Sequence, residues 1–203
     1  MKIAHIGATG KVGRKILEEL LRRGHVVTAI SRHPENAAAN AEVTARQGDI
    51  AEPDGLAALL KGHDAIISSA PFLPGSSLKL LEAVRKSGVK RYLAVGGAGS
   101  LEVAPGKLLK DSDAIPPEWL PVINEGAELL KLLRADQQLD WTFFSPAAVI
   151  GAGERTGKFR LGGDQLITRA DGKSVISYDD YAIALVDELE NPQHIHKRFT
   201  IGY

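Results

Sequence analysis

The 203-residue chain contains no cysteine, a single methionine and few aromatic residues, which make up 5% of the sequence. Without cysteine the chain forms no disulfide, offers no thiolate nucleophile and holds no cysteine-ligated metal. The absence is typical of proteins in a reducing compartment, and we predict a cytoplasmic location.

An excess of charge of one sign is also absent, because 25 Lys and Arg residues balance 25 Asp and Glu residues. This balance predicts neither a nucleic-acid partner nor a membrane partner. No apolar run approaches the roughly 20 residues of a transmembrane helix, and the first residues resemble a buried strand rather than a signal peptide. The expected partner is a small molecule, and the expected assembly is a monomer or a small homo-oligomer.

The six histidines are scattered along the chain. His194 and His196 stand close together in the sequence, but no carboxylate cluster accompanies them, whereas a metal ion needs several ligands. We therefore predict no metal site, and we expect these two histidines to be exposed to solvent.

Apolar runs alternate with helical patterns, which is typical of a parallel sheet covered by helices on both faces. The predicted strands are 3–6, 26–30, 43–47, 65–69, 91–95, 141–144 and 198–202. The predicted helices are 11–23, 53–60, 76–87, 122–135 and 179–189, with a short helix or loop over 36–41. The fold class is α/β: a single Rossmann-type doubly wound parallel sheet over residues 1–203, in which 151–203 form a small C-terminal lobe on the substrate side.

Two segments depart from this alternation. Residues 101–121 hold four prolines and little periodicity, so they are predicted to form a long loop. Residues 166–168 and 174–176 flank an Asp-Gly pair and predict a β-hairpin. Ser177 and Asp180 predict a capping box for the last helix.

The first strand leads into the motif Gly7-Ala-Thr-Gly10-Lys-Val-Gly13 and then into an amphipathic helix. In a dinucleotide-binding turn, Gly7 allows the sharp turn, Gly10 allows a pyrophosphate to approach the backbone, and Gly13 lets the helix pack tightly on the sheet. The N–H groups and the positive end of the helix dipole then face the phosphates. The alternative is a glycine turn that only packs a helix on a sheet.

The second strand ends in Ser31-Arg32. At this position NAD-binding proteins have an acidic residue that holds the ribose 2′-hydroxyl. The planar cation of Arg32 suits a 2′-phosphate instead. NADP(H) is therefore favoured over NAD(H), the alternative being that Arg32 is only an exposed loop residue.

The third and fourth strands are followed by further candidates. Asp49 is placed to accept from the adenine amino group and Ile50 to pack on the ring, although Asp49 is equally suited to a turn before the next helix. The segment after the fourth strand lies where open α/β sheets bind ligands, and is predicted to border the ribose or pyrophosphate unless it is an ordinary loop. Its residues are Ser69, Ala70, Pro71 and Phe72.

Small residues follow the fifth and sixth strands. Gly97 leaves room for the cofactor, Ser100 is placed to donate to a substrate, and Ser145-Pro146 are placed to border the nicotinamide. Either stretch is otherwise a tight turn. Trp119, in the proline-rich segment, is suited to stack on a flat substrate or to anchor the loop on the core.

The chain resembles the NADH-flavin reductase branch of the atypical short-chain dehydrogenase/reductases, which is related to biliverdin reductase B-type flavin reductases and to NmrA-like proteins. The resemblance covers essentially the whole chain and rests on the glycine motif, on Trp141-Thr-Phe-Phe-Ser-Pro-Ala-Ala, on Gly153-Glu-Arg-Thr-Gly-Lys and on Ile176-Ser-Tyr-Asp-Asp-Tyr-Ala. The predicted cofactor-binding residues are Gly7, Thr9, Gly10, Lys11, Val12, Gly13, Ser31, Arg32, Asp49, Ile50, Ser69, Ala70, Pro71, Phe72, Gly97, Ser145 and Pro146.

One departure from this family concerns the Tyr-x-x-x-Lys pair with which short-chain dehydrogenases transfer protons. The helix over 122–135 contains no tyrosine. Hydride transfer from NADPH to a flavin or a quinone-like acceptor is compatible with this absence, because the flavin is then a substrate that takes its proton from water. The alternatives are a non-catalytic NmrA-like redox sensor that binds NADP(H), and an epimerase or dehydratase that would need Glu125 or Glu128 as its acid or base.

Overall fold

The computed structural model describes residues 1–36, 41–113 and 115–203. Its central sheet has eight strands in the order β10-β12-β8-β5-β4-β1-β2-β3, and neighbours are parallel except for the antiparallel pair β10 and β12. The strands are β1 (Lys2–Ile6), β2 (Val26–Ser31), β3 (Val43–Gln47), β4 (Ala65–Ser68), β5 (Arg91–Val95), β8 (Asp140–Ser145), β10 (Arg160–Gly162) and β12 (Lys197–Gly202). The predicted Rossmann-type α/β fold is confirmed.

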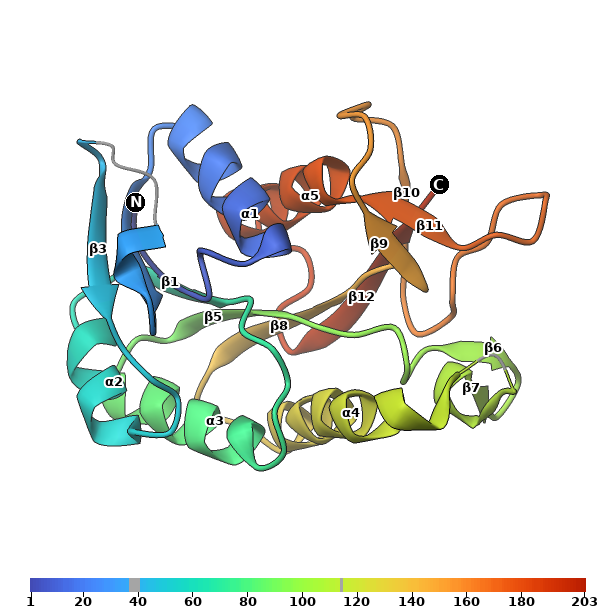
Figure 1. Ribbon diagram of the computed structural model, residues 1–203, viewed down its shortest axis with the longest axis horizontal. Helices are drawn as coiled ribbons and strands as arrows, with labels where there is room; N and C mark the ends of the chain where they lie inside the picture. The colour runs from blue at the N-terminus through green and yellow to red at the C-terminus, as the bar shows by residue number, and fades with distance from the viewer. Residues whose placement is uncertain (37–40, 114) are drawn as a thin grey trace.

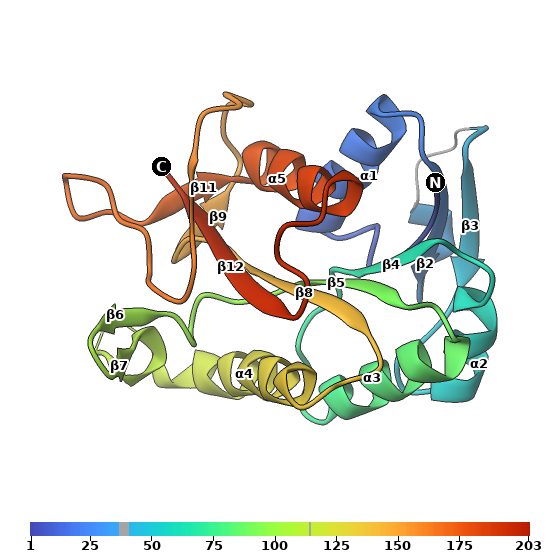
Figure 2. The same ribbon diagram turned by 180° about the vertical axis from the view of Figure 1, so that it is seen from behind.

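Helices cover the sheet on both faces (Figures 1 and 2). One face carries α1 (Lys11–Arg22) and α5 (Tyr178–Glu190), and the other carries α2 (Pro53–Leu60), α3 (Ser76–Ser87) and α4 (Leu120–Arg134). Successive strand residues point to opposite faces, so β1 sends Ile3 into the core under α1 and Ala4 into the core under α2 and α3. Burial on both faces explains the nearly continuous apolar runs of the central strands.

The predicted long loop over 101–121 is wrong. This region contains the short hairpin of β6 (Glu102–Ala104) and β7 (Lys107–Leu108), the 3₁₀ turns η2 (Leu109–Asp111) and η3 (Pro117–Trp119), and the first residues of α4. The strands are too short to display a period of two, and Glu102 also bridges to Gln165, a partner that local sequence cannot indicate. Residue 114 of this segment lies outside the described residues. The same holds for residues 37–40 of the short helix or loop predicted at 36–41, whose first residue ends the 3₁₀ turn η1 (Pro34–Asn36).

The predicted hairpin near the C-terminus is also wrong. The turn exists, since Gly172 has φ +79° and the Arg169 N–H donates to the Lys173 carbonyl at 2.8 Å. However, β11 (Val175–Ser177) pairs in parallel with β9 (Val149–Gly151) rather than with its neighbour in sequence. The segment 151–203, predicted as a small lobe, supplies β10 and β12 to the central sheet and α5 to one of its faces.

The last helix has the predicted serine cap, but not the reciprocal half of the box. The Asp180 N–H donates to Ser177 Oγ at 3.0 Å. The Asp180 carboxylate instead accepts from the N–H groups of Thr156 and Gly157 and from the hydroxyls of Thr156 and Tyr203. Within the described part of the chain, no helix combines the length and the apolar character that crossing a membrane requires.

Candidate functional site

The glycine turn after β1 has the geometry that its sequence predicts. Gly7 has φ +82°, which L-residues rarely adopt, and a Cβ there would lie 2.7 Å from the backbone nitrogen of Ala70. The Gly7 N–H donates to the Ile30 carbonyl at 2.8 Å, and the Gly10 N–H donates to the Gly7 carbonyl at 3.1 Å. These bonds join the ends of β1 and β2 and direct the chain into α1.

Helix α1 begins at an open N-terminus. Gly10 is its N-cap residue, no side chain caps the helix, and no acidic residue lies in its first turn. The first-turn N–H groups of Lys11, Val12 and Gly13 have no acceptor within the helix, and the dipole adds positive potential there. A Cβ on Gly10 would meet only the Gly7 carbonyl oxygen, at 3.4 Å, so the glycine leaves the surface of the turn open to a phosphate.

The N-terminus of α3, in contrast, is already occupied by a carboxylate of the protein. Glu125 of α4 accepts from the Gly75 N–H at 2.9 Å and from the Ser77 N–H at 2.7 Å. Partial burial tends to raise the pKa of Glu125, but these backbone hydrogen bonds outweigh it and hold the pKa below its usual value. Of these two helix N-termini, α1 is therefore the one that presents unpaired donors to an anion.

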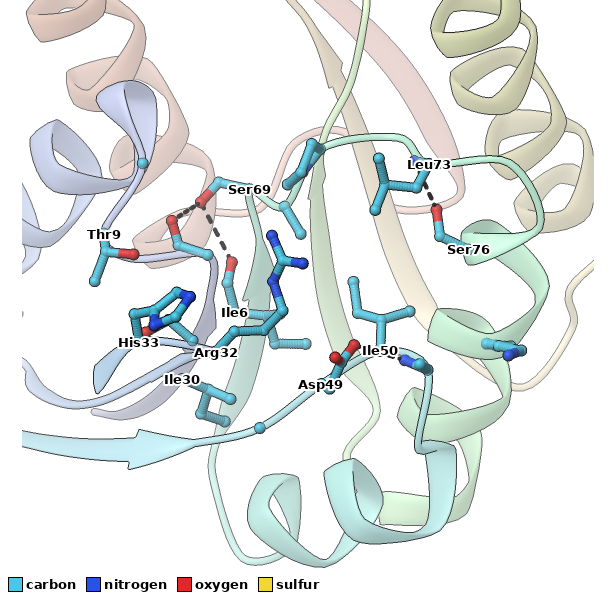
Figure 3. A pocket seen from close by; sticks show the side chains of 18 of the residues that line it. Ile6, Thr9, Ile30, Arg32, His33, Asp49, Ile50, Ser69, Leu73 and Ser76 are labelled. Carbon is cyan, nitrogen blue, oxygen red and sulfur yellow. Dashed lines mark hydrogen bonds between the residues drawn. The ribbon is translucent and has the colours of Figure 1, made fainter. Parts of the chain in front are cut away.

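A pocket of about 430 Å³ opens beside the turn (Figure 3). It lies outside the carboxyl ends of β1, β2, β3 and β4, which is where doubly wound sheets bind ligands. Ten of the predicted cofactor-binding residues line it: Gly7, Thr9, Gly10, Ser31, Arg32, Asp49, Ile50, Ser69, Ala70 and Pro71. Residues separated by up to 64 positions thus meet at one edge of the sheet.

Arg32 and Ser31 carry the polar groups at the end of β2. Arg32 is exposed, and Figure 3 shows its guanidinium extending into the pocket. Among the described residues it has no ion-pair partner. The Ser31 hydroxyl is buried and has no hydrogen-bond partner in the described part of the chain. A ligand with acceptor oxygens at this point would satisfy both groups, so the residues present fit a dinucleotide.

Asp49 has the turn role that the sequence suggested, and it also lines the pocket. Its Oδ1 accepts from the Ala51 N–H at 2.9 Å, which is an Asx turn ahead of α2. Ile50 is half-buried beside it and packs against the core under α2 and α3. One oxygen of Asp49 is thus committed to the turn, while Ile50 offers an apolar surface for a planar ring.

Seven predicted cofactor residues do not line the pocket: Lys11, Val12, Gly13, Phe72, Gly97, Ser145 and Pro146. Gly13 has a packing role, because a Cβ there would lie 2.1 Å from the Gly7 carbonyl oxygen. Phe72 turns away from the pocket and packs on α4, where a Cβ on Gly126 would lie 3.1 Å from its ring. Close packing at the β4–α3 loop decides this orientation, which the sequence does not reveal.

Ser145 and Gly97 meet at the ends of β8 and β5. The Ser145 hydroxyl is buried and donates to the Gly97 carbonyl at 3.0 Å. Because β5 and β8 are parallel neighbours next to β4, these residues lie at the same sheet edge as the pocket. Their contact with a nicotinamide stays a prediction.

Other residues that line the pocket were not predicted from the sequence: Ile6, Ile30, His33, Asn36, Gly48, Ala51, Leu73, Pro74, Gly75, Ser76 and Lys79. Most are immediate neighbours of predicted residues. The stretch Leu73–Ser76 is different, because the β4–α3 loop folds back to form a wall in which the Leu73 N–H donates to Ser76 Oγ at 3.1 Å. The Pro-Gly pair in this loop is the feature of the sequence that could have indicated the turn.

The remaining candidates are engaged elsewhere. The Ser100 hydroxyl accepts from Arg198 at 3.2 Å, and Trp119 is 61% exposed, so it does not anchor a loop on the core. His196 is exposed as expected, but His194 stacks on Phe199 with ring centroids 4.2 Å apart. Across residues 1–36, 41–113 and 115–203, no three His, Cys, Asp or Glu side chains are grouped to hold a metal ion.

Comparison with known proteins agrees with this geometry. The protein YwnB of Bacillus subtilis, which is uncharacterized, is 41% identical over 99% of this chain and 98% of its own length. The crystal structure of a "putative epimerase" from Bacteroides thetaiotaomicron matches with a TM-score of 0.95 and 44% identity, covering 100% of this chain and 96% of that protein. A "putative NADH-flavin reductase" from Streptococcus pneumoniae matches with a TM-score of 0.83 and 38% identity, covering 100% and 99% of the two chains.

A family model described as NAD(P)H-binding matches residues 7–192. The match begins at the first glycine of the turn and extends through α5 and its C-terminal end. Fold, glycine turn and family agree with the resemblance found in the sequence, and the chain belongs to the NAD(P)H-binding family.

Proposed function

We propose that the protein is an NADPH-dependent oxidoreductase that transfers hydride to a flavin or to a quinone-like flat acceptor. The observation that carries the proposal is a pocket that extends from the open N-terminus of α1 to the guanidinium of Arg32. A dinucleotide with a 2′-phosphate has anionic groups for both ends of this arrangement.

The pocket and the first turn of α1 beside it both have a role in holding the cofactor. The first-turn N–H groups of Lys11, Val12 and Gly13 bind the pyrophosphate, and Arg32 binds the 2′-phosphate with charge-assisted hydrogen bonds. Ile50 packs on the adenine ring. The bound cofactor supplies the hydride, and the protein positions its nicotinamide at the ends of β5 and β8.

The surroundings of that edge favour an acceptor that needs no proton from the protein. Helix α4, which carries the tyrosine and lysine in related reductases, has no tyrosine, and Glu125 is committed to the cap of α3. A flavin or quinone takes its proton from water after hydride transfer, so positioning alone is sufficient for catalysis. We propose that the flavin binds as a substrate and not as a resident group.

The name of the Bacteroides relative draws attention to epimerase chemistry, which needs an acid or base near the substrate. Glu125 has a lowered pKa and both its oxygens accept backbone N–H groups, so it is a poor proton donor at neutral pH. Glu128 pairs with Lys131 at 3.2 Å on the exposed side of α4. Neither carboxylate favours this alternative over hydride transfer.

Steady-state oxidation of NADPH in the presence of flavin mononucleotide or quinones tests the proposal. The expected result is acceptor-dependent turnover above the uncatalysed rate, with NADPH preferred to NADH. Tight NADPH binding without turnover of any acceptor would contradict a reductase and support the redox-sensor alternative.

A further inference from the structure

A buried histidine lies beneath the glycine turn. His5 of β1 is 0% exposed and points to the same face of the sheet as Ile3, toward α1. Its Nε2 lies 2.9 Å from the hydroxyl of Ser69, the residue that follows β4. The Ser69 hydroxyl in turn lies 3.1 Å from the Gly7 carbonyl oxygen and 3.3 Å from that of Ile6.

The direction of these hydrogen bonds follows from the number of protons. A carbonyl oxygen only accepts, so the single hydroxyl proton of Ser69 is donated to the backbone of the turn. The Ser69 oxygen must then accept from His5, which requires the proton of the imidazole to be on Nε2. Nδ1 is buried without a partner among the described residues, and this tautomer leaves it without a proton.

The charge state of His5 agrees with this assignment. Complete burial lowers the pKa of His5 to about 3, so the ring is neutral at physiological pH and carries one proton. His5 Nε2–H therefore donates to the Ser69 hydroxyl, which in turn donates to the Gly7 carbonyl oxygen.

We propose that His5 is a positioning residue for the dinucleotide site, holding the Gly7 carbonyl turned into the protein through Ser69. This inference rests on the proposed function, because it assigns a role in binding the pyrophosphate of NADPH. His5 has no exposed surface and cannot touch the cofactor itself.

The Gly7 carbonyl matters because an anion site must present N–H groups and turn its carbonyl oxygens away. This oxygen accepts from Ser69 and also from the Gly10 N–H at 3.1 Å. It is packed against the first turn of α1, where a Cβ on Gly13 would lie 2.1 Å from it and 2.8 Å from Ser69 Oγ. Two donors and close packing thus hold the oxygen in contacts within the protein, while the first-turn N–H groups at the open N-terminus of α1 stay available to an anion.

Two substitutions at position 5 separate this role from packing. His5→Leu removes the donor, whereas His5→Gln retains an N–H donor close to the position of Nε2. We expect His5→Leu to weaken NADPH binding, measured by fluorescence titration, by about fivefold to tenfold, the effect of losing one hydrogen bond. KM for NADPH should rise in parallel while kcat changes by less than about twofold, and His5→Gln should restore binding to within about twofold of the wild type.

Ser68→Ala is the matched control. Ser68 precedes Ser69, points to the opposite face of the sheet, and its hydroxyl is bonded to that of Tyr92 at 2.7 Å. The variant loses a buried hydrogen bond without touching the glycine turn, so its melting temperature should fall while its Kd for NADPH stays within about twofold. Equal Kd values for wild type, His5→Leu and Ser68→Ala would overturn the inference and leave the proposed function intact.

Failure of the proposed function gives a different result. A wild type that binds no NADPH at all would remove both the proposed function and the inference, whereas NADPH binding without turnover would remove the proposed function alone. If His5→Leu does not fold, His5→Asn replaces it, since its shorter side chain cannot reach Ser69. Weak binding by His5→Asn together with wild-type binding by His5→Gln supports the inference, and equal binding by the two overturns it.

Discussion

A Cβ atom on Gly13 would lie 2.1 Å from the carbonyl oxygen of Gly7. Real Cβ atoms do not approach backbone oxygens so closely, so a side chain at this position forces α1 away from the turn. The third glycine of the motif is therefore required for packing, whereas we propose that the second is required for the ligand.

Gly13→Ala is expected to lower the free energy of unfolding by about 2–3 kcal/mol, because overpacking against backbone is relieved only by moving a helix. Urea unfolding measures the change. Gly24→Ala is the control: Gly24 has φ +77° but open space around its Cβ position, so only the strain of about 1 kcal/mol is expected. A loss at Gly13 no larger than at Gly24 would contradict the packing role.

Gly10→Ala is expected to leave the fold intact and to weaken NADPH binding by at least about tenfold. Its Cβ makes only an ordinary 3.4 Å contact within the protein, but it occupies the surface that the pyrophosphate approaches. Calorimetric titration gives the affinity and thermal melting the stability. Gly55→Ala in α2, where the added Cβ has only a 3.9 Å contact to Glu52, should raise stability by about 0.5–1 kcal/mol and leave binding unchanged.

Arg32→Ala is expected to weaken NADPH binding by about 10–100-fold and NADH binding by less than about threefold, since a charge-assisted hydrogen bond contributes about 1.5–3 kcal/mol. Arg46→Ala provides the control, because Arg46 is exposed on β3 and does not line the pocket. Equal losses for the two cofactors would refute the assignment of the 2′-phosphate to Arg32.

Glu125→Ala tests whether this carboxylate is a cap or a catalytic acid. As a cap of α3, its loss should cost about 1 kcal/mol of stability and change kcat by less than about threefold. Loss of a general acid would instead reduce kcat by about 10²–10⁴-fold. Glu128→Ala on the same helix, with its exposed partner Lys131, should change neither quantity.

Asp180 predicts a specific acid sensitivity. Burial tends to raise its pKa, but hydrogen bonds from Thr156, Gly157 and Tyr203 outweigh it, so the pKa of Asp180 lies below the usual value for an aspartate. A carboxylate whose pKa is depressed by folding stabilises the protein above its unfolded pKa, and this stabilisation is lost as the pH falls through the folded pKa. Wild type should exceed Asp180→Asn in stability by a constant amount from pH 7 to about pH 5, with the gap narrowing below about pH 4.

Urea unfolding at a series of pH values checks this prediction. Asp54→Asn is the matched control, since Asp54 is exposed and pairs with Lys86 on the surface, where ion pairs contribute little. If the difference in stability between wild type and Asp180→Asn stays the same down to pH 3, the charge of this carboxylate is not the source of the stabilisation.

The sequence predictions are accurate where a structure depends on neighbouring residues and fail where it depends on residues far apart in the chain. The boundaries of β3, α2, α3 and β5 agree with the predictions because apolar runs, a proline at a helix start and a glycine at a helix end are local signals. The hairpin predicted around Gly172 failed because its strand pairs with β9 in parallel. A period of two shows that a segment is a strand but not which strand it joins.

The candidate site divides in the same way. The glycine turn, Arg32 at the end of β2 and the missing tyrosine of α4 were determined by the sequence itself, because each depends on residues adjacent in the chain. The cap of α3 by Glu125, 50 residues away, the bond between His5 and Ser69, 64 residues apart, and the pocket wall of the β4–α3 loop were decided only by tertiary structure. Local composition determines what a segment can do, whereas the close packing of distant segments determines which polar groups meet and which remain available to a ligand.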